Sequence, residues 1–313
     1  MRPPPKWLLL GGAALLLAGL CAAQEWFGGG GRRRGNWRGG GDSIGPIVRT
    51  EGGVSVNEDT VRTARETVSH STGTPNWTNE PGFEDDVFTF ARIIYKFDKE
   101  RIRSQMAWIN DYPDSDLNLS FRLQQLTSMK VDPNGRTLKL TEADLCRYPF
   151  IYMVKAGRME LRDEEVPILR KYLASGGALM ADDFWGDEDW SNFEAQIKRV
   201  LPKQKWVELP MDHMIFQSPF PLHLKFDKSS LQVPSIHLWE RRGVTYRGGE
   251  DTHDMHVRAW LDDKQRIMVI ATHNTDNGDG WEREGEDVEY FKTFSETRAY
   301  PLGINIITYL MTH

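Results

Sequence analysis

From Asp86 to the C-terminus, short apolar runs alternate with amphipathic segments. Val87 to Tyr95, Phe150 to Val154 and Ala178 to Ala181 are predicted strands, because each run is apolar and is bounded by polar or turn-forming residues. Apolar residues at helical spacing predict helices over Asp116 to Thr127, from Asp163 to the Gly176-Gly177 stop, and over Trp190 to Val200. Strands that alternate with helices favour an α/β fold with a mostly parallel sheet covered on both faces.

The last part of the chain adds two further elements. Val257 to Leu261 and Arg266 to Thr272 predict a hairpin around Asp262-Asp263-Lys264, and Leu302 to Met311 predicts an apolar closing helix. We therefore expect one α/β domain over residues 86–313.

The first residues have the pattern of a secretory signal peptide. Arg2 and Lys6 precede an apolar run from Trp7 to Leu20, which is followed by the small residues Cys21-Ala22-Ala23. This run is shorter than the roughly 20 residues of a membrane-spanning helix. We expect cleavage near Ala23, removal of residues 1–23 and an exported protein, periplasmic or secreted, with no transmembrane domain in the mature chain. An uncleaved N-terminal membrane anchor is the alternative.

Residues 24–85 are predicted to be a disordered linker. Their first part is rich in Gly and Arg, and the remainder is polar, with one candidate short helix from Asn57 to Thr67. The basic stretch is either a solvated tether or a segment attracted to anionic lipid or polymer.

Charge and cysteine content exclude several classes of protein. The chain has 39 basic and 45 acidic side chains and a net charge of -6, which argues against a nucleic-acid partner. Cys21 and Cys146 are its two cysteines, too few for a disulfide framework or a thiolate metal site.

Polar segments follow the predicted strands at the positions where open parallel sheets bind ligands. They run from Trp108 to Asp116, from Asp182 to Asp187 and from His273 to Glu282, and Asp212-His213 belongs to the irregular region between them. Ten residues in these segments are candidate ligand-binding residues: Asp111, Asp116, Asp182, Asp183, Trp185, His213, His273, Asn274, Asp276 and Asp279.

The carboxylates of these segments could either bind a metal ion or act as a general acid and base. Side chains alternate along a strand, so one of Asp182 and Asp183 is expected to face the crevice. A second carboxylate close by, from Asp111 or Asp276, would raise one pKa or require a cation between the two. A divalent cation is therefore a possible cofactor, with Asp183, His273 and Asp276 as candidate ligands. Alternatively, Asp182 or Asp183 caps the following turn and helix.

The aromatic residues and histidines of these loops have two interpretations. His213 is a candidate site residue, but it lies beside apolar residues, where a lone histidine is more often a hydrogen-bonded structural residue. Four tryptophans concentrate in the same loops: Trp108, Trp185, Trp190 and Trp281. They either line a cleft for a sugar or peptide or pack beneath the loops.

The sequence lacks the characteristic motifs of several enzyme classes. The chain contains no GxSxG, HExxH or Walker A pattern. Cys146 precedes its predicted strand, which is the wrong end of the sheet for an elbow nucleophile.

Seven motifs together resemble the DUF4159 family of bacterial proteins, from about Val87 to His313: FTFARIIY, NDYPDSDLNL, YPFIYMVKAG, ALMADDFWGDEDW, ELPMDHMIF, THNTDNGDGWEREG and YPLGINIITYLMTH. The resemblance implies the class I glutamine amidotransferase-like superfamily and a flavodoxin-like three-layer sandwich. Active amidotransferases carry a nucleophilic cysteine on the tight turn after a strand. The equivalent turn here, Ala181 to Phe184, has neither Cys nor Ser, so amide transfer through a thioester is not supported.

Three functions remain open, the third being a scaffold whose Trp-rich loops dock another exported protein through an exposed apolar patch. The first is an exported, degenerate amidotransferase-like domain that binds a ligand, such as a carbohydrate, or an envelope protein at the strand-end crevice. The second is a carboxylate- and His-dependent hydrolase, with or without a metal ion. The sequence does not decide whether the protein is an enzyme.

Overall fold

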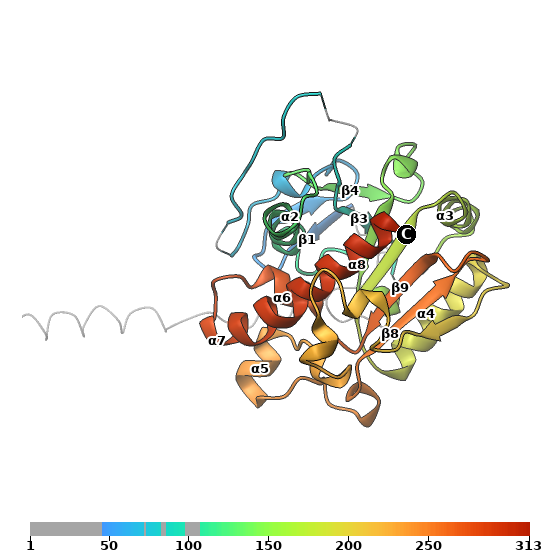
Figure 1. The fold of residues 1–313 in the computed structure, drawn as a ribbon. Helices are drawn as coiled ribbons and strands as arrows, with labels where there is room; N and C mark the ends of the chain where they lie inside the picture. The colour runs from blue at the N-terminus through green and yellow to red at the C-terminus, as the bar shows by residue number, and fades with distance from the viewer. Residues whose placement is uncertain (1–45, 72, 83–85, 98–106) are drawn as a thin grey trace, which may run out of the picture. The chain divides into compact units, whose positions relative to one another are not determined.

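In the computed structural model, residues 46–71, 73–82, 86–97 and 107–313 are described (Figure 1). The strands are β1 Ile47–Arg49, β2 Ser55–Asn57, β3 Ala91–Ile94, β4 Arg136–Lys139, β5 Phe150–Val154, β6 Ala178–Phe184, β7 Trp206–Glu208, β8 His256–Leu261 and β9 Ile267–His273. The α-helices are α2 Asp114–Leu126, α3 Glu165–Ala174, α4 Gly186–Val200, α5 Ile236–Arg242, α6 Asn277–Glu282, α7 Val288–Tyr290 and α8 Tyr300–Thr312, with a π-helix, η9, at Phe291–Ala299. Short 3-10 helices are η2 Ala64–Glu66, η3 Leu145–Arg147, η4 Ala156–Arg158, η5 Met214–Phe216, η6 Leu222–Leu224, η7 Ser229–Leu231 and η8 Glu250–Thr252.

Seven strands form the central sheet in the order β4-β3-β5-β6-β9-β8-β7. Strands β4, β3, β5, β6 and β9 pair in parallel, and β8 runs antiparallel to both of its neighbours. The predicted α/β class with a mostly parallel sheet is therefore confirmed, as is the hairpin of β8 and β9. Near-continuous apolar runs make the inner strands, because a parallel sheet is covered on both faces.

The strand β6 is longer than its apolar run predicts. It continues through Asp182 and Asp183 to Phe184, and the pairing with β9 shifts in register between Ala181 and Phe184. Every residue of β6 is buried. The two adjacent aspartates therefore belong to the buried end of a central strand.

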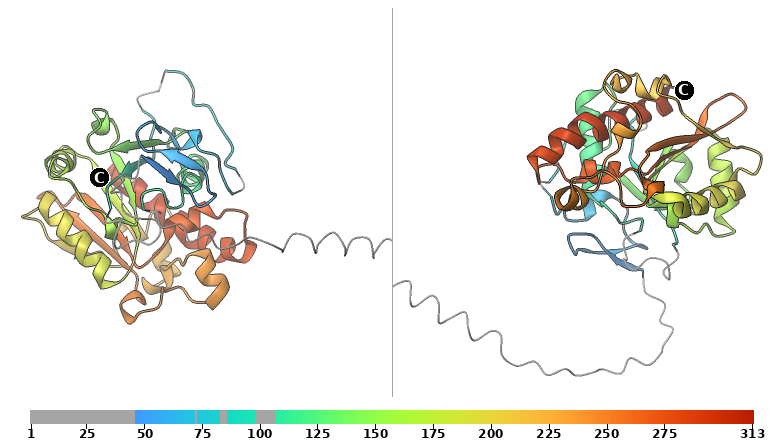
Figure 2. Two further views of the ribbon diagram at one scale, coloured as in Figure 1. Left: turned by 180° about the vertical axis from the view of Figure 1, so that it is seen from behind. Right: turned by 90° about the horizontal axis from the view of Figure 1, so that it is seen from below.

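Helices pack on both faces of this sheet (Figure 2). Alternate side chains of β5 point to opposite faces, so Ile151 and Met153 join one apolar cluster while Phe150, Tyr152 and Val154 join the other. Side chains of α3 and α4 complete the first cluster, and side chains of α2, α6 and α8 complete the second.

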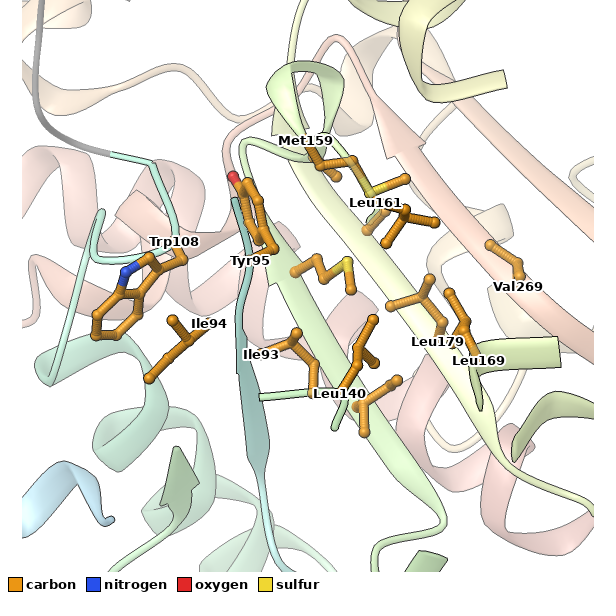
Figure 3. Close-up of a cluster of buried hydrophobic side chains, with 14 of the residues drawn as sticks. Ile93, Ile94, Tyr95, Trp108, Leu140, Met159, Leu161, Leu169, Leu179 and Val269 are labelled. Atoms are coloured by element: carbon orange, nitrogen blue, oxygen red, sulfur yellow. The ribbon is translucent and has the colours of Figure 1, made fainter. Parts of the chain in front are cut away.

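Figure 3 shows part of the first cluster. Ile93 of β3, Leu179 of β6 and Val269 of β9 lie with Leu169 of α3, all 0% exposed. The apolar positions recognised in the sequence as strand and helix faces thus form this core.

The segment expected to be a linker is folded over residues 46–71 and packs on the α/β domain. β1 and β2 pair as an antiparallel hairpin, and the range expected to be a helix, Asn57 to Thr67, holds the end of β2, a turn and only the three-residue η2. Val56, Val61 and Ala64 join the first apolar cluster, and hydrogen bonds also attach the segment: the Arg65 side chain donates to the Pro133 carbonyl at 2.8 Å, and the Tyr112 hydroxyl donates to the Thr63 carbonyl at 2.9 Å. A polar composition does not reveal such contacts.

The predicted leader and the Gly/Arg-rich stretch lie outside the described residues. Within the part of the chain that is described, no helix is both long enough and apolar enough to cross a membrane.

Candidate functional site

Unusual backbone conformations concentrate at the carboxyl ends of the parallel strands. Asp111, Lys155, Asp183 and Asn274 all have positive φ, between 51° and 60°, and lie in the segment after β3, directly after β5, in β6 and directly after β9. The left-handed region of positive φ is energetically unfavourable for residues other than glycine, and residues held in it cluster at functional sites. Four such residues at one edge of the sheet identify that edge as the candidate functional site.

A cavity of about 400 Å³ opens at this edge. It is lined by Glu51, Asn110, Lys155, Ser235, His237, Leu238, Arg241, Arg242, Arg247, Asp276, Asp279 and Arg283. The helices α5 and α6, which lie next to one another in Figure 1, supply five of these residues. Five lining side chains are lysine or arginine and three are carboxylates, so the wall of the cavity has a positive balance.

Asp183 lies beneath the cavity and holds several lining residues in place. Its Oδ2 accepts from Lys155 Nζ at 2.5 Å and from Asn110 Nδ2 at 3.0 Å, and its Oδ1 accepts from Arg247 at 2.8 Å. The Trp185 indole also donates to Oδ1, at 2.9 Å. Burial alone would raise the pKa of Asp183, but attraction to Lys155 and Arg247 holds that pKa below its usual value. Asp183 is therefore an anionic anchor for the basic wall.

Asp182 faces the opposite side of the sheet, as side-chain alternation predicts. Its Oδ1 accepts from the Thr272 hydroxyl at 2.5 Å and from Asn277 Nδ2 at 2.8 Å, and its Oδ2 accepts from the Gly278 amide at 3.0 Å. Burial raises the pKa of Asp182 to about 6, although these hydrogen bonds act in the other direction. Asp182 thus ties α6 to β6 instead of lining the cavity.

Three other carboxylates converge at the floor of the cavity, which Asp276 and Asp279 line and Asp111 underlies. One oxygen each from Asp111, Asp276 and Asp279 lies within 4.8 Å of the others, and all three residues are buried. Asp276 caps α6 by accepting from the Asp279 amide at 3.1 Å, and it accepts from Arg247 at 3.1 Å. Burial, and then the charge of neighbouring aspartates, raises the pKa values of Asp111 and Asp276 well above the usual range.

The N-terminal segment closes one side of the site through a network of ion pairs. Arg283 pairs with Glu51 and with Glu282, the latter at 2.8 Å. His70 Nδ1 lies 3.0 Å from Asp114 Oδ2 and His70 Nε2 lies 2.7 Å from Glu282 Oε1. Interaction with Asp114, and then with Glu282, raises the pKa of His70 to about 10. The imidazolium therefore links the N-terminal segment to α2 and α6.

His273 and Asn274 do not line the cavity. The His273 ring donates from Nε2 to the Gly186 carbonyl at 3.0 Å and packs against Phe184 and Trp190. Burial lowers the pKa of His273 to about 3, so the ring is neutral. Asn274 accepts from the Gly186 amide at 2.8 Å and donates to the carbonyls of the 251–254 turn. The candidate metal set Asp183, His273 and Asp276 is thus not the set that the structure brings together.

The remaining candidates have other surroundings. Asp116 pairs with Arg92 in the interior, and Trp185 contacts the site through Asp183 and through the Arg247 guanidinium, 5.0 Å above its ring. His213 accepts from the Ile215 amide and packs against Tyr309 with the two ring planes inclined by 57°, and it is not among the residues that line the cavity. Asp111, Asp276 and Asp279 are the predicted residues at the cavity floor, and Asp183 supports its wall.

Several site residues were not singled out from the sequence. Lys155 follows a predicted strand directly, so the strand-end argument would have found it. Arg241, Arg242 and Arg247 belong to the basic, glycine-containing run ERRGVTYRGG, which was treated as irregular. Glu51 lay in the segment interpreted as a linker, and its place at the cavity is a tertiary contact.

The fold and this site define an α/β protein with a charged cavity at the carboxyl edge of a mostly parallel sheet. The chain belongs to the family described as Domain of unknown function (DUF4159), which matches residues 89–311. The resemblance seen in the sequence motifs is thereby confirmed at the level of the family. Among curated proteins, none matches the chain.

Proposed function

We propose that this protein is an exported binding protein that takes a small anionic ligand in the strand-end cavity. The observation that carries the proposal is the pair Arg241 and Arg242: both line the cavity, and within the described residues neither side chain has a hydrogen bond or ion pair. Lys155, Arg247 and Arg283, by contrast, are already paired with carboxylates. Both residues are exposed, so their guanidinium groups are free to donate to a ligand, and their positive charge beside a positive wall favours an anionic one.

The chemistry of arginine narrows the ligand class. A guanidinium presents a planar fork of donors that fits a carboxylate or phosphate group in a bidentate manner. A phosphorylated small molecule or an acidic carbohydrate has such groups, and the Trp185 ring under Arg247 keeps that guanidinium oriented. The shared feature is an oxyanion, so the proposal concerns oxyanion-bearing ligands as a class.

We also place the domain in the class I glutamine amidotransferase-like superfamily, with a flavodoxin-like three-layer arrangement. In support, the strand order β4-β3-β5-β6 is the 2-1-3-4 order of the flavodoxin-like sheet. Asp183, at φ 52°, stands near the strand-to-helix turn on which an amidotransferase carries its cysteine. The described free thiol, Cys146, lies in η3 before β5. A binding role without thioester chemistry follows from this arrangement.

Titration of the full-length chain with inorganic phosphate, citrate and galacturonate, followed by calorimetry, tests the function. We expect at least one of these anions to bind, and the R241Q/R242Q variant to bind it at least about 100-fold more weakly, because a hydrogen bond to a charged group contributes about 1.5–3 kcal/mol and the variant removes two such groups. The matched control is K171Q/K198Q, which removes two exposed charges on α3 and α4 away from the cavity. No binding of any of the three anions, or equal binding by R241Q/R242Q and wild type, would refute the proposal.

A hydrolase is the second candidate, favoured by the proximity of Asp111 and Asp276 at the cavity floor. A carboxyl group with a raised pKa is suited to general acid/base work. His273 would have no direct part, because its ring lies among Phe184, Trp190 and the Gly186 carbonyl. We expect any turnover of p-nitrophenyl phosphate or p-nitrophenyl acetate to fall at least about 100-fold in D276N. Absence of turnover in wild type, with and without Mn²⁺, would remove this candidate.

A further inference from the structure

The side chain of Asp111 is incompletely satisfied in the interior. Asp111 is 0% exposed, and its Oδ1 accepts from Asn110 Nδ2 at 2.6 Å. Its Oδ2 has no hydrogen-bond partner among the described residues, and no described basic side chain forms an ion pair with this carboxylate. An uncompensated carboxylate in the interior is strongly unfavourable, so a group that neutralises it is expected.

The unpaired oxygen is directed at the turn that carries the other two carboxylates. A Cβ atom built on Gly278 would lie 2.2 Å from Asp111 Oδ2, so glycine is required for the carboxylate to approach this close. Gly278 lies between Asp276 and Asp279 in the first turn of α6. Asp111 Oδ2 therefore lies against the backbone that presents both partners.

The separations among the three carboxylates suit one hard cation. Two oxygens bound to the same ion are separated by at most twice the metal–oxygen distance, about 4.2 Å for Mg²⁺ and about 4.6–5.2 Å for Ca²⁺. The ligand oxygens of Asp111, Asp276 and Asp279 all lie within 4.8 Å of one another. Aspartate oxygens are the donors that such ions prefer.

The charge balance around the floor supports a divalent ion. Seven buried carboxylates lie around it: Asp111, Asp114, Asp182, Asp183, Asp276, Asp279 and Glu282. In the part of the chain that is described, their ion pairs involve four cationic groups: His70, Lys155, Arg247 and Arg283. The carboxylates therefore outnumber the cationic groups, and a divalent cation would offset part of this excess of acidic side chains.

We infer that Asp111, Asp276 and Asp279 bind one hard divalent cation at the floor of the cavity. Three protein carboxylates leave coordination positions open toward the cavity, because Asp276 and Asp279 also line it. This inference deepens the proposed function, because an oxyanion held by Arg241 and Arg242 would also coordinate the cation. That second role of the cation rests on the proposed function. Binding of the cation itself requires the three carboxylates alone.

Mn²⁺ binding to the full-length chain, measured by calorimetry and by electron paramagnetic resonance, tests the inference. We expect one Mn²⁺ per chain, competition by Mg²⁺ or Ca²⁺, and at least about tenfold weaker binding in D111N and in D279N. G278A should weaken binding similarly by displacing Asp111. D263N is the matched control, because it removes an exposed carboxylate in the turn between β8 and β9, outside the cluster, and it should bind Mn²⁺ as wild type does.

The outcomes separate this inference from the proposed function. No Mn²⁺ binding by wild type at millimolar concentration, or unchanged binding by D111N and D279N folded as judged by circular dichroism, overturns the cation site. R241Q/R242Q should retain Mn²⁺ affinity while losing anion affinity. Mn²⁺ binding without any anion binding would support the cation site and refute the proposed function. Anion binding without Mn²⁺ binding would support the proposed function and refute the cation site.

Discussion

Replacement of Arg92 by leucine is expected to lower the free energy of unfolding by about 3–5 kcal/mol, because it leaves the buried carboxylate of Asp116 without its partner. Arg92 is 0% exposed and donates from Nε to both oxygens of Asp116, at 3.0 and 2.9 Å. The same guanidinium donates to the carbonyls of Trp108 and Asn110 at 2.8 and 2.9 Å. The variant should therefore also weaken ligand or cation binding, because the loop before Asp111 loses its support.

Urea denaturation of R92L, D116L and the double variant R92L/D116L measures this effect. The double variant should be more stable than the sum of the single losses predicts, since it leaves no unpaired buried charge. K198L, at an exposed position on α4, should change the stability by less than about 0.5 kcal/mol. Additive losses in the double variant would contradict the assigned pair.

Replacement of His70 by glutamine is expected to lower the free energy of unfolding by about 2–4 kcal/mol at pH 6. His70 has a side-chain exposure of 14% and lies between Asp114 and Glu282. Its pKa is raised from 6.5 to about 10 in the folded protein. The stabilisation from the imidazolium is thus complete below pH 6.5 and is lost as the pH rises toward 10.

The difference in the free energy of unfolding between wild type and H70Q should consequently decrease from pH 6.5 to pH 10, as measured by urea denaturation at several pH values. His237 offers a matched comparison, because it is 60% exposed and lies 3.7 Å from Glu240. H237Q should have nearly the stability of wild type throughout. A difference between wild type and H70Q that does not change with pH would show that His70 acts by packing instead of by charge.

The elements that the sequence predicted well depend on local pattern. β5 coincides with its apolar run, and α8 and the hairpin of β8 and β9 lie within a few residues of their predicted positions. Burial on both faces of a parallel sheet produces continuous apolar runs, which can be recognised without knowing the neighbouring strands. The strand β3, at Ala91–Ile94, is shorter than the run from Val87 to Tyr95, because its pairing with β4 and β5 sets its ends.

The strand-end argument also found part of the site. Asp111, Asp183, Asp276 and Asp279 come from segments that follow predicted strands, and the sheet brings these segments together. The same argument selected His273, whose ring faces the aromatic layer formed with Trp190 and Phe184. Which way a side chain points at a strand end depends on the exact residue at which regular pairing stops, and the register shift in β6 shows how small differences decide it.

By itself, the sequence determined the α/β class, the family and the set of polar strand-end segments, because apolar periodicity and local motifs encode them. The tertiary structure alone decided which charges meet: Asp111 with Asp276 and Asp279, Lys155 and Arg247 with Asp183, and Glu51 with Arg283. These partners are separated by 28 to 232 positions in the chain, apart from Asp276 and Asp279. Ion pairing and burial act through space, so separation along the chain carries no information about them.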